Sequence, residues 1–423
     1  MKLINGDSRK ELKKLKENSI DSVVSDPPFE IKFMAKQWDN TGIAFDKKFW
    51  KEVLRVVKPG GHGLIFGFPR THHRLMVAME DAGWEIHDCL MWVFGSGFPK
   101  SHNISKGIDK KLGKKRKVIG TSKAGLTKGN ICAFSGTEEF DLTTPSTDLA
   151  KFWDGWGTGL KSAYLSIILI RKSLSEKTIV DNVLKWGVGG INIDSCRIKY
   201  TKKDALAVQR ANSPGGGRYK KTNNISIDFP PPLQDYNPEK GRWPANLIFS
   251  EEAGELLDQQ SGISKSKDRF YKNIPYVYKN KEYNAKGFIN KIKPNSPSNY
   301  RDNGGASRFF YCPKASKKER NIGCENLKPK PQNNHPTLKP IKLLKYLIRL
   351  ISPPEGVILD PFMGSGSTGC AAISENKEFI GIEMNDDYYD IAKRRIKYFL
   401  DKKDKPYDIF SSENKKKEKF LFY

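Results

Sequence analysis

Short apolar segments alternate with amphipathic stretches along residues 1–99 of the chain. The pattern predicts strands at Lys2–Asn5, Ile20–Ser25, Gly63–Gly67 and His87–Phe94, and helices at Ser8–Lys16, Lys48–Val57 and His72–Ala82. Two of these helices end at glycine signals, Lys58-Pro59-Gly60-Gly61 and Gly83. Such an alternation with short connections is typical of the α/β class, in which helices pack on a mostly parallel sheet.

The alternation is interrupted and then resumes twice. A polar stretch from Lys100 to Trp156 is followed by Ala163–Ile170, which reads as one more buried strand. Near the C-terminus the pattern predicts a strand at Gly356–Leu359, an alanine-rich helix at Gly369–Ser374 and a strand at Glu378–Ile382. We therefore predict one doubly wound, mostly parallel sheet that is assembled from separate parts of the chain.

The charge of the chain indicates a polyanionic partner. Its 423 residues include 74 Lys and Arg against 48 Asp and Glu, a net charge of +26. Nucleic acid is the first candidate, because lysine and arginine side chains that contact phosphates release condensed counterions. A basic surface that is merely solvated is the alternative.

The segment 176–330 carries half of this excess charge. It contains 29 Lys and Arg against 16 Asp and Glu, a net +13. Aromatic residues are interleaved with the charge in Asp268-Arg269-Phe270-Tyr271-Lys272 and Tyr276-Val277-Tyr278-Lys279. This mixture suits phosphate contact combined with stacking or groove contact. A solvated insertion without function is the competing interpretation.

Cysteine usage and hydropathy point to a reduced cytosol. The six cysteines form no CxxC pair and no metal-binding spacing with histidine. The N-terminus lacks the apolar stretch of a signal peptide, and no run approaches the ~20 apolar residues that a membrane span needs. We therefore expect a cytoplasmic protein with neither a membrane partner nor a metal.

The tetrapeptide Asp26-Pro27-Pro28-Phe29 stands where the predicted strand Ile20–Ser25 ends. It combines an acidic acceptor, a backbone carbonyl held by proline and an aromatic face, a set that suits a flat heterocycle carrying an amino group. In open α/β sheets, ligands bind outside the carboxyl ends of the strands. An ordinary proline turn is the alternative.

A glycine turn follows the strand Gly356–Leu359, in the sequence Asp360-Pro361-Phe362-Met363-Gly364-Ser365-Gly366-Ser367-Thr368. Such a turn lets a ligand approach the backbone closely. It lacks the Gly-Lys-Ser/Thr ending of a phosphate-binding loop, and Asp360 favours a cationic group over a pyrophosphate. Glu383 lies at the strand tip where doubly wound nucleotide folds bind ribose. An adenosyl cofactor bearing an amino acid, S-adenosylmethionine, satisfies both demands.

Three motifs together resemble the β class of amino-group DNA methyltransferases: Asp26-Pro27-Pro28-Phe29, His335-Pro336-Thr337-Leu338-Lys339-Pro340 and Asp360-Pro361-Phe362-Met363-Gly364-Ser365-Gly366. In that class the catalytic motif precedes the cofactor motif, and a target-recognition region lies between them, which is the order here. Smaller blocks also match: Asn5-Gly6-Asp7, Phe33-Met34-Ala35-Lys36-Gln37-Trp38-Asp39, Gly241-Arg242-Trp243-Pro244 and Ala306-Ser307-Arg308-Phe309-Phe310-Tyr311. Residues 101–150 and 201–299 are poorly matched.

The resemblance implies roles for individual residues. The catalytic motif would be Asp26, Pro27, Pro28 and Phe29. The methionine part of the cofactor would be held by Asp360, Phe362, Gly364, Ser365 and Gly366. Glu383 would bind the ribose of the cofactor, and Asp7 would bind the edge of its adenine. Thr337 and Lys339 would bind the carboxylate of the cofactor. For Asp7 a helix N-cap is the alternative, and for Lys339 a solvent-exposed lysine. The family usually has tyrosine where this chain has Phe29, so the ring face is kept and a hydroxyl is lost.

The expected chemistry is methylation of an exocyclic amino group. The lone pair of the adenine amino nitrogen is delocalised into the ring, and accepting its two protons at the Asp26 carboxylate and the Pro27 carbonyl frees that lone pair. Phe29 would stack on a base rotated out of the duplex. Aspartate at the first motif position is associated in the family with adenine. We therefore expect a site-specific DNA adenine-N6 methyltransferase. The alternatives are cytosine-N4 methylation, an RNA or protein methyltransferase, and a non-catalytic DNA-binding module.

The same reasoning divides the chain. Residues 1–175 are expected to form the catalytic half of the methyltransferase domain, with the polar insertion 101–156, and residues 331–400 the cofactor-binding half. Residues 176–330 would be the basic target-recognition insertion and 401–423 a basic tail. Duplex DNA is the expected partner. A homodimer and a cognate restriction endonuclease are further partners that this class allows.

Overall fold

The computed structural model of the chain describes residues 1–31, 39–95, 101–123, 139–199, 241–265, 303–313, 319, 321–324 and 338–403. The chain divides into two compact units. Unit 1 comprises Met1–Ser195, Asn246–Ala253 and Cys312–Tyr423, and unit 2 comprises Cys196–Ala245 and Gly254–Tyr311. The domain boundaries expected from the sequence stay predictions.

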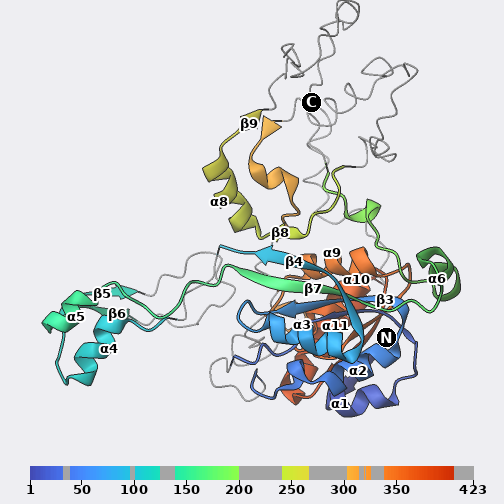
Figure 1. Cartoon of the computed structure of the whole chain (residues 1–423), viewed down its shortest axis with the longest axis horizontal. Coiled ribbons are helices and arrows are strands. Elements are labelled where there is room, and N and C mark those ends of the chain that lie inside the picture. Colours follow the sequence, from blue (N-terminus) through green and yellow to red (C-terminus); the bar gives the residue numbers. More distant parts are fainter. Residues whose placement is uncertain are drawn as a thin grey trace, which may run out of the picture. The chain divides into compact units, whose positions relative to one another are not determined.

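An eight-stranded sheet forms the centre of unit 1, in the order β1-β12-β11-β2-β3-β7-β4-β8 (Figure 1). The strands are β1 (Lys2–Asn5), β2 (Ile20–Ser25), β3 (Val57–Gly67), β4 (Trp84–Val93), β7 (Tyr164–Lys172), β8 (Leu247–Phe249), β11 (Val357–Asp360) and β12 (Glu378–Glu383). Only β7 runs antiparallel to its neighbours among these strands. The predicted mostly parallel α/β fold is confirmed, and β11 and β12 lie between β1 and β2, so the two ends of the chain build one sheet.

Helices cover both faces of this sheet. In unit 1 they are α1 (Ser8–Glu11), α2 (Lys47–Val56), α3 (His72–Ala82), α6 (Ile179–Trp186), α9 (Ile341–Ile351), α10 (Ser367–Ser374) and α11 (Asp386–Lys403). The helices α2 and α3 pack together, and α10 packs against both α9 and α11. All six residues of β2 are buried, as expected for a central parallel strand that is covered on both sides.

The first helix is shorter than the predicted Ser8–Lys16. The α-helix ends at Glu11 and continues as a 3₁₀ turn, Leu12–Lys14. Leu12 and Leu15 are both buried, and a spacing of three residues places them on one side of a 3₁₀ helix. Arg55 donates to the carbonyl oxygens of both leucines at 2.9 and 3.0 Å, which satisfies the end of the turn.

The third strand begins earlier than predicted. Helix α2 does end before Lys58-Pro59-Gly60-Gly61, but β3 starts at Val57, and the four residues form a bulge opposite Ile20 and Ser22. Gly60 has a φ of +79°, which favours glycine. A Cβ on Gly61 would lie 2.9 Å from the Asp21 carbonyl oxygen, so the strands can approach only with glycine there.

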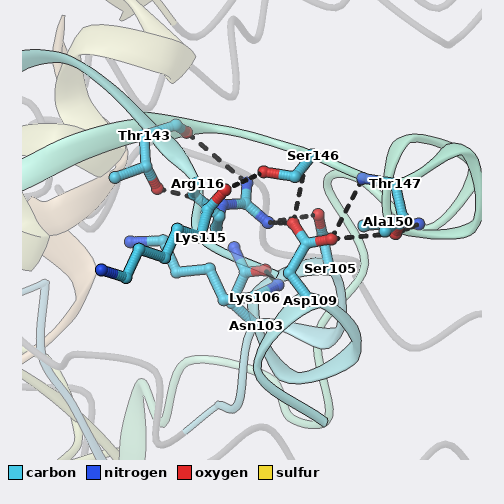
Figure 2. Close-up of polar contacts among 10 residues, drawn as sticks. All are labelled: Asn103, Ser105, Lys106, Asp109, Lys115, Arg116, Thr143, Ser146, Thr147 and Ala150. Atoms are coloured by element: carbon cyan, nitrogen blue, oxygen red, sulfur yellow. Dashed lines mark hydrogen bonds and ion pairs between the residues drawn. The ribbon is translucent and has the colours of Figure 1, made fainter. Parts of the chain in front are cut away.

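The polar insertion between β4 and β7 has a fold of its own, which the sequence pattern did not predict. Its described residues form α4 (Ile104–Lys111), the antiparallel pair β5 (Lys117–Lys123) and β6 (Glu139–Thr144), and α5 (Asp148–Phe152) (Figure 1). A buried carboxylate, Asp109, joins these elements by hydrogen bonds (Figure 2). Hydrophobic periodicity does not reveal a module whose centre is an ion pair.

Unit 2 brings together two of the short blocks matched in the sequence. Arg242 donates to the Arg308 carbonyl oxygen at 3.4 Å, and both guanidinium groups lie over the ring of Phe309, at 4.9 and 4.1 Å from its centroid. Arg197 lies 4.9 Å from the ring centroid of Trp243, which is 60% exposed. Basic and aromatic side chains are thus interleaved in space. The interleaved stretches at 268–272 and 276–279 lie outside the described residues.

Candidate active site

The two principal motifs lie at the ends of neighbouring strands. Strands β2 and β11 are parallel, with Ile358 opposite Ser22 and Leu359 opposite Val23. This register places the end of β2, before Asp26, beside Asp360. The Ser25 hydroxyl donates to Asp360 Oδ1 at 2.7 Å, across 335 residues of sequence. The proline motif and the glycine loop therefore share one site at the carboxyl edge of the sheet.

The Asp26 carboxylate has one paired and one unpaired oxygen. Oδ2 forms an ion pair with Lys339, whose side chain is only 7% exposed. Oδ1 is buried and has no hydrogen-bond partner within the part of the chain that the structure describes. Burial raises the pKa of Asp26, and the charge and hydrogen bond of Lys339 oppose that rise. An unpaired, buried acceptor is suited to a donor supplied by a ligand.

Lys339 joins the proline motif. Its ammonium lies 5.4 Å from the ring centroid of Phe29 and 5.2 Å from that of Phe66. The resemblance assigns Lys339 to the carboxylate end of the cofactor, and that role stays a prediction. The structure shows a buried lysine in contact with Asp26, which excludes the alternative of a solvent-exposed side chain. Thr337, assigned with it, lies outside the described residues.

The aromatic end of the motif is held from several sides. The ring of Phe29 stacks on Phe68, with centroids 5.7 Å apart and planes 29° apart. The Phe29 carbonyl oxygen accepts from Thr71 Oγ1 at 2.9 Å. Pro27 is buried and Pro28 is half-buried. These contacts fix the direction in which the ring faces.

Asp39 anchors the loop after the motif, a role that we did not predict. Its buried carboxylate accepts from the backbone N–H groups of Glu30, at 2.9 Å, and Ile31, at 3.2 Å. Glu30 has a φ of +55°, a strained conformation that such contacts stabilise. The matching block from Phe33 to Asp39 was the available signal, although its residues 33–38 lie outside the described part.

Asp360 is a buried acid at the start of the glycine loop. It is 2% exposed, and its Oδ1 also accepts from the Phe362 N–H at 3.1 Å. Burial raises the pKa of Asp360 to about 6, the nearby Asp26 charge adds to the rise, and hydrogen bonds from Ser25, Thr368 and Phe362 oppose it. Above that pH the site holds a buried anion, which favours a cationic ligand group.

The loop itself is shaped by glycine and by Glu383. Gly364 and Gly366 have φ values of +53° and +79°. The Glu383 carboxylate accepts from the N–H of Gly364 and of Asn385, each at 2.8 Å. Burial raises the pKa of Glu383, against the lowering effect of these backbone hydrogen bonds. The structure thus brings the predicted ribose-binding acid into direct contact with the predicted loop.

Helix α11 supports the loop from behind through Arg395, which we did not single out from the sequence. This arginine is fully buried and donates to the Ser365 carbonyl oxygen at 2.6 Å and to the hydroxyls of Ser365 and Ser367, each at 3.1 Å. The Ser365 hydroxyl is therefore engaged within the protein. Arg395 follows the exposed Lys393 and Arg394 and precedes the buried Ile396, so its residue type gave no sign that it is buried.

Replacing Gly366 with alanine is expected to lower the free energy of unfolding by at least about 2 kcal/mol. The new Cβ would lie 2.9 Å from Ala392 Cα, at a backbone φ that disfavours side chains. Urea unfolding measures the change. The matched control is Gly107→Ala in α4, where a Cβ meets nothing within 4 Å and the variant should be as stable as the wild type or slightly more so. Equal stability of both variants would contradict this account of the loop.

The remaining predicted residues have structural contacts of their own. Asp7 is the N-cap of α1, accepting from the Arg9 N–H at 2.9 Å, so the alternative role proposed for it is present; its cofactor role stays a prediction. Hydrogen bonding and the charge of Arg9 lower the pKa of Asp7 despite its partial burial. Phe362 packs against Phe49 with ring centroids 5.1 Å apart, at the base of the loop.

Metal-binding clusters, disulfides and membrane-spanning helices are absent from the described residues. No group of three or more His, Cys, Asp or Glu side chains there could hold a metal ion. The five described cysteines form no disulfide. None of the described helices combines the length and apolarity that crossing a membrane requires.

Comparison with known proteins gives local matches to curated relatives. One 63-residue segment is 49% identical to the DNA adenine methyltransferase YhdJ of Escherichia coli, covering 15% of this chain and 21% of that protein. A 62-residue segment is 47% identical to the type II methyltransferase M.HindIII of Haemophilus influenzae, covering 15% and 20%. The chain thus matches about a fifth of the length of these relatives.

Two further comparisons extend over most of the chain. The cytosine-N4-specific PvuII DNA methyltransferase aligns over 94% of this chain and 89% of its own, with 15% identity and a TM-score of 0.41. The family model described as DNA methylase, for N6 and N4 methylation, matches residues 20–394. Because this match spans both motifs and all the sequence between them, the chain belongs to the N6/N4 DNA methylase family.

Proposed function

We propose that this protein is a site-specific DNA methyltransferase that transfers a methyl group from S-adenosylmethionine to the N6 amino group of an adenine rotated out of duplex DNA. The observation that carries the proposal is the buried, unpaired Asp26 Oδ1 beside the glycine loop. An acceptor for an amino group, Asp26, and a buried acid suited to a cationic cofactor end, Asp360, lie at adjacent strand ends. DNA adenine methyltransferases are also among the named relatives.

The residues present fit the cofactor. When bound, S-adenosylmethionine supplies a methyl group on a positively charged sulfur. Asp360, ionised above a pH of about 6, is a buried partner for the ammonium of its amino-acid part. Gly364 and Gly366 hold the turn at positive φ values, and Gly366 also lets the loop pack closely on Ala392 of α11. Glu383, held by the loop, presents a carboxylate to the ribose hydroxyls.

The proline motif would activate the amino group. Asp26 Oδ1 and the Pro27 carbonyl oxygen would each accept a hydrogen bond from the amino group, which frees the nitrogen lone pair to bond to the methyl carbon as the bond between that carbon and the donor sulfur breaks. Methylation makes the nitrogen acidic, and Asp26 then receives one proton. Because burial raises the pKa of Asp26, this carboxylate accepts a proton more readily than an exposed aspartate would. Phe29 stacks on the base and holds it in line with the donor.

Lys339 occupies the position of a hydrogen-bond donor to Asp26 in this structure. Its ammonium also lies over the face of Phe29, where the base is proposed to stack. Lys339 pairs with Oδ2 and leaves Oδ1 to the amino group, but its ammonium covers the ring face of Phe29, so we propose that it moves from this face when the base enters. The carboxylate end of the cofactor, to which the resemblance assigns it, is the acceptor to which it would turn.

Product analysis tests the function directly. The purified chain is incubated with labelled S-adenosylmethionine and duplex DNA, and the DNA is digested to nucleosides for mass spectrometry. We expect N6-methyladenine. Cytosine-N4 methylation, the alternative that the family allows, would give N4-methylcytosine and overturn the choice of base. Label found in RNA but not in DNA would overturn the choice of substrate.

We also propose that the basic segment 176–330 reads the DNA sequence. Its described residues gather Arg242, Arg308 and Phe309, with Arg197 over the exposed Trp243, a combination that suits phosphate contact and stacking. Single-molecule sequencing of DNA from cells that express the chain would report the methylated site. A homodimer and a cognate restriction endonuclease are proposed partners, which sedimentation of the purified chain and digestion assays on methylated DNA would test.

A further inference from the structure

The insertion between β4 and β7 is carried on a two-stranded arm. We call residues 101–123 and 139–163 the arm module. The β4–β7 ladder ends with Val93 opposite Tyr164, and the Phe94 N–H continues it by donating to the Ala163 carbonyl oxygen at 2.9 Å. Farther out, the Thr158 N–H donates to Ser101 Oγ at 2.8 Å, and Asn103 forms an antiparallel bridge with Gly157. The two chains are thus paired next to the sheet and again where the module begins.

The arm leaves the sheet at the edge that holds the candidate active site. Ser166, near the start of β7, lies opposite Gly67, the last residue of β3. Ile65 of β3 in turn lies opposite Ser25, the residue before Asp26. The base of the arm, at the end of β4 and the start of β7, and the proline motif, at the end of β2, therefore lie at the same edge of the sheet. A substrate bound over Asp26 approaches the sheet at this edge.

The interior of the arm module is organised by Asp109 (Figure 2). This fully buried carboxylate accepts from Arg116 at 3.0 Å, from the Ser146 N–H at 2.9 Å and from the Thr147 hydroxyl at 2.8 Å. Arg116 also donates to Thr143 Oγ1 on β6 at 3.0 Å. The contacts link α4, the start of β5, the end of β6 and the N-cap of α5, so they hold the surface of the module in one arrangement.

One half of the arm module, residues 101–123, is strongly basic. Residues 101–123 contain eight Lys and Arg and a single acidic residue, Asp109, whose charge Arg116 neutralises inside the module. Six lysines are exposed: Lys106, Lys110, Lys111, Lys114, Lys115 and Lys117. The other half of the module, residues 139–163, adds two lysines and four acidic residues, so the module as a whole keeps a net charge of +5. Such a cluster raises the local concentration of a polyanion.

Exposed aromatic residues accompany the lysines. Phe152 and Trp156 are 75% and 60% exposed, and both rings contact Trp153 edge to face, with centroids 5.6 and 5.0 Å apart. Large exposed rings in the same module as exposed lysines suit sugars and bases next to phosphates. An acidic protein surface would be complementary in charge to the lysines, but binding to it would not require the exposed aromatic rings. The combination favours nucleic acid over a protein partner.

We propose that the arm module is a second DNA-binding surface, which contacts the phosphate backbone of the duplex beside the target base. This inference rests on the proposed function, since that function makes duplex DNA the substrate. The arm begins at the edge where the base would enter, and its lysines face solvent. The module would then add affinity without reading the sequence, because phosphate contacts carry no sequence information.

The test is the triple variant Lys110→Gln, Lys114→Gln, Lys117→Gln. All three side chains are exposed, so the fold should be unchanged. We expect the dissociation constant for a long duplex to rise by about tenfold or more, and the slope of log affinity against log salt to fall by about 2 to 3. S-adenosylmethionine affinity should match the wild type. The control replaces three exposed lysines of α2 and α11, Lys51, Lys393 and Lys397, with glutamine and should bind DNA as the wild type does.

A loss no larger than that of the control, with an unchanged salt slope, would overturn the proposal. A shift of the sedimenting species of the triple variant without DNA would overturn it in favour of contact between two copies of the chain. Methyl transfer by the wild type on the same duplex tests the proposed function separately from the proposed role of the arm module. If the wild type methylates DNA and the triple variant binds normally, only the arm proposal fails. If the wild type binds DNA without methylating it, the proposed function fails, whatever the lysines do.

Discussion

The Asp26→Asn variant is expected to lose methyl transfer by a factor of about 10²–10⁴ while it still binds S-adenosylmethionine. The amide keeps the size of the side chain and one acceptor oxygen, but it cannot hold the negative charge that draws protons from the amino nitrogen. Asp26 makes no hydrogen bond to the glycine loop, which it touches through its neighbour Ser25. Single-turnover kinetics with labelled cofactor measure the transfer, and equilibrium dialysis measures the cofactor affinity.

Two controls keep this result interpretable. Glu30→Gln removes a second carboxylate from the same loop, one that accepts only from Thr41 Oγ1 at 3.1 Å among the contacts described, and should leave transfer near the wild-type rate. Asp26→Asn also leaves the buried Lys339 ammonium without its counter-ion, which could destabilise the fold. The double variant Asp26→Asn, Lys339→Met removes this unpaired charge, so transfer that stays low in it is not due to lost folding. Wild-type rates in Asp26→Asn would eliminate the proposed mechanism.

The Asp360→Asn variant is expected to bind S-adenosylmethionine about 100-fold more weakly, because a buried charged partner of the cofactor ammonium is lost. At the same time the free protein should become more stable at neutral pH. The pKa of Asp360 is raised from 3.8 to about 6, so the folded state holds its proton more tightly than the unfolded state does. The stability from that proton is fully present below pH about 4 and lost as pH rises through about 6.

The size of the pKa shift of Asp360 sets how much stability the Asp360→Asn variant gains. The shift of about 2 pKa units corresponds to about 3 kcal/mol, by which the ionised acid destabilises the free protein above pH 7. Asparagine keeps the acceptor oxygen for Ser25 and Phe362 and removes the charge. In urea unfolding between pH 4 and pH 8, the free energy of unfolding of the variant should therefore rise relative to that of the wild type as the pH increases. Cofactor affinity of the wild type should weaken below pH about 6, as Asp360 takes up its proton.

Asp21, a buried acid near the start of β2, provides a control for the Asp360→Asn variant. Asp21 pairs with Lys58 and accepts from the Val357 N–H at 2.7 Å, so its charge is engaged within the fold. Asp21→Asn should destabilise the protein and leave cofactor affinity unchanged. If Asp360→Asn bound the cofactor as well as the wild type, Asp360 would have a structural role only, and the proposed cofactor pocket would have to be placed elsewhere.

Local patterns accounted for most of the sheet. Each predicted strand is present, since alternation of short apolar runs with helical periodicity depends on neighbouring residues only. The errors arose where distant contacts intervene. Arg55 ends the first helix early, and the close approach of Asp21 turns Lys58-Pro59-Gly60-Gly61 into a bulge within β3. The arm module was missed because its interior is an ion pair and not an apolar stripe.

The sequence by itself determined seven strands of the sheet, the helices α2, α3 and α10, the order of the motifs and the residue types that the proposed chemistry needs, because these depend on local spacing and on side-chain chemistry. Only the tertiary structure decided which residues meet. It placed Ser25 on Asp360, Lys339 on Asp26 and Arg395 beneath Ser365, contacts that join residues far apart in the chain. Strand order, register and burial set such contacts and the pKa values that follow from them, and none of these is encoded in any single stretch of sequence.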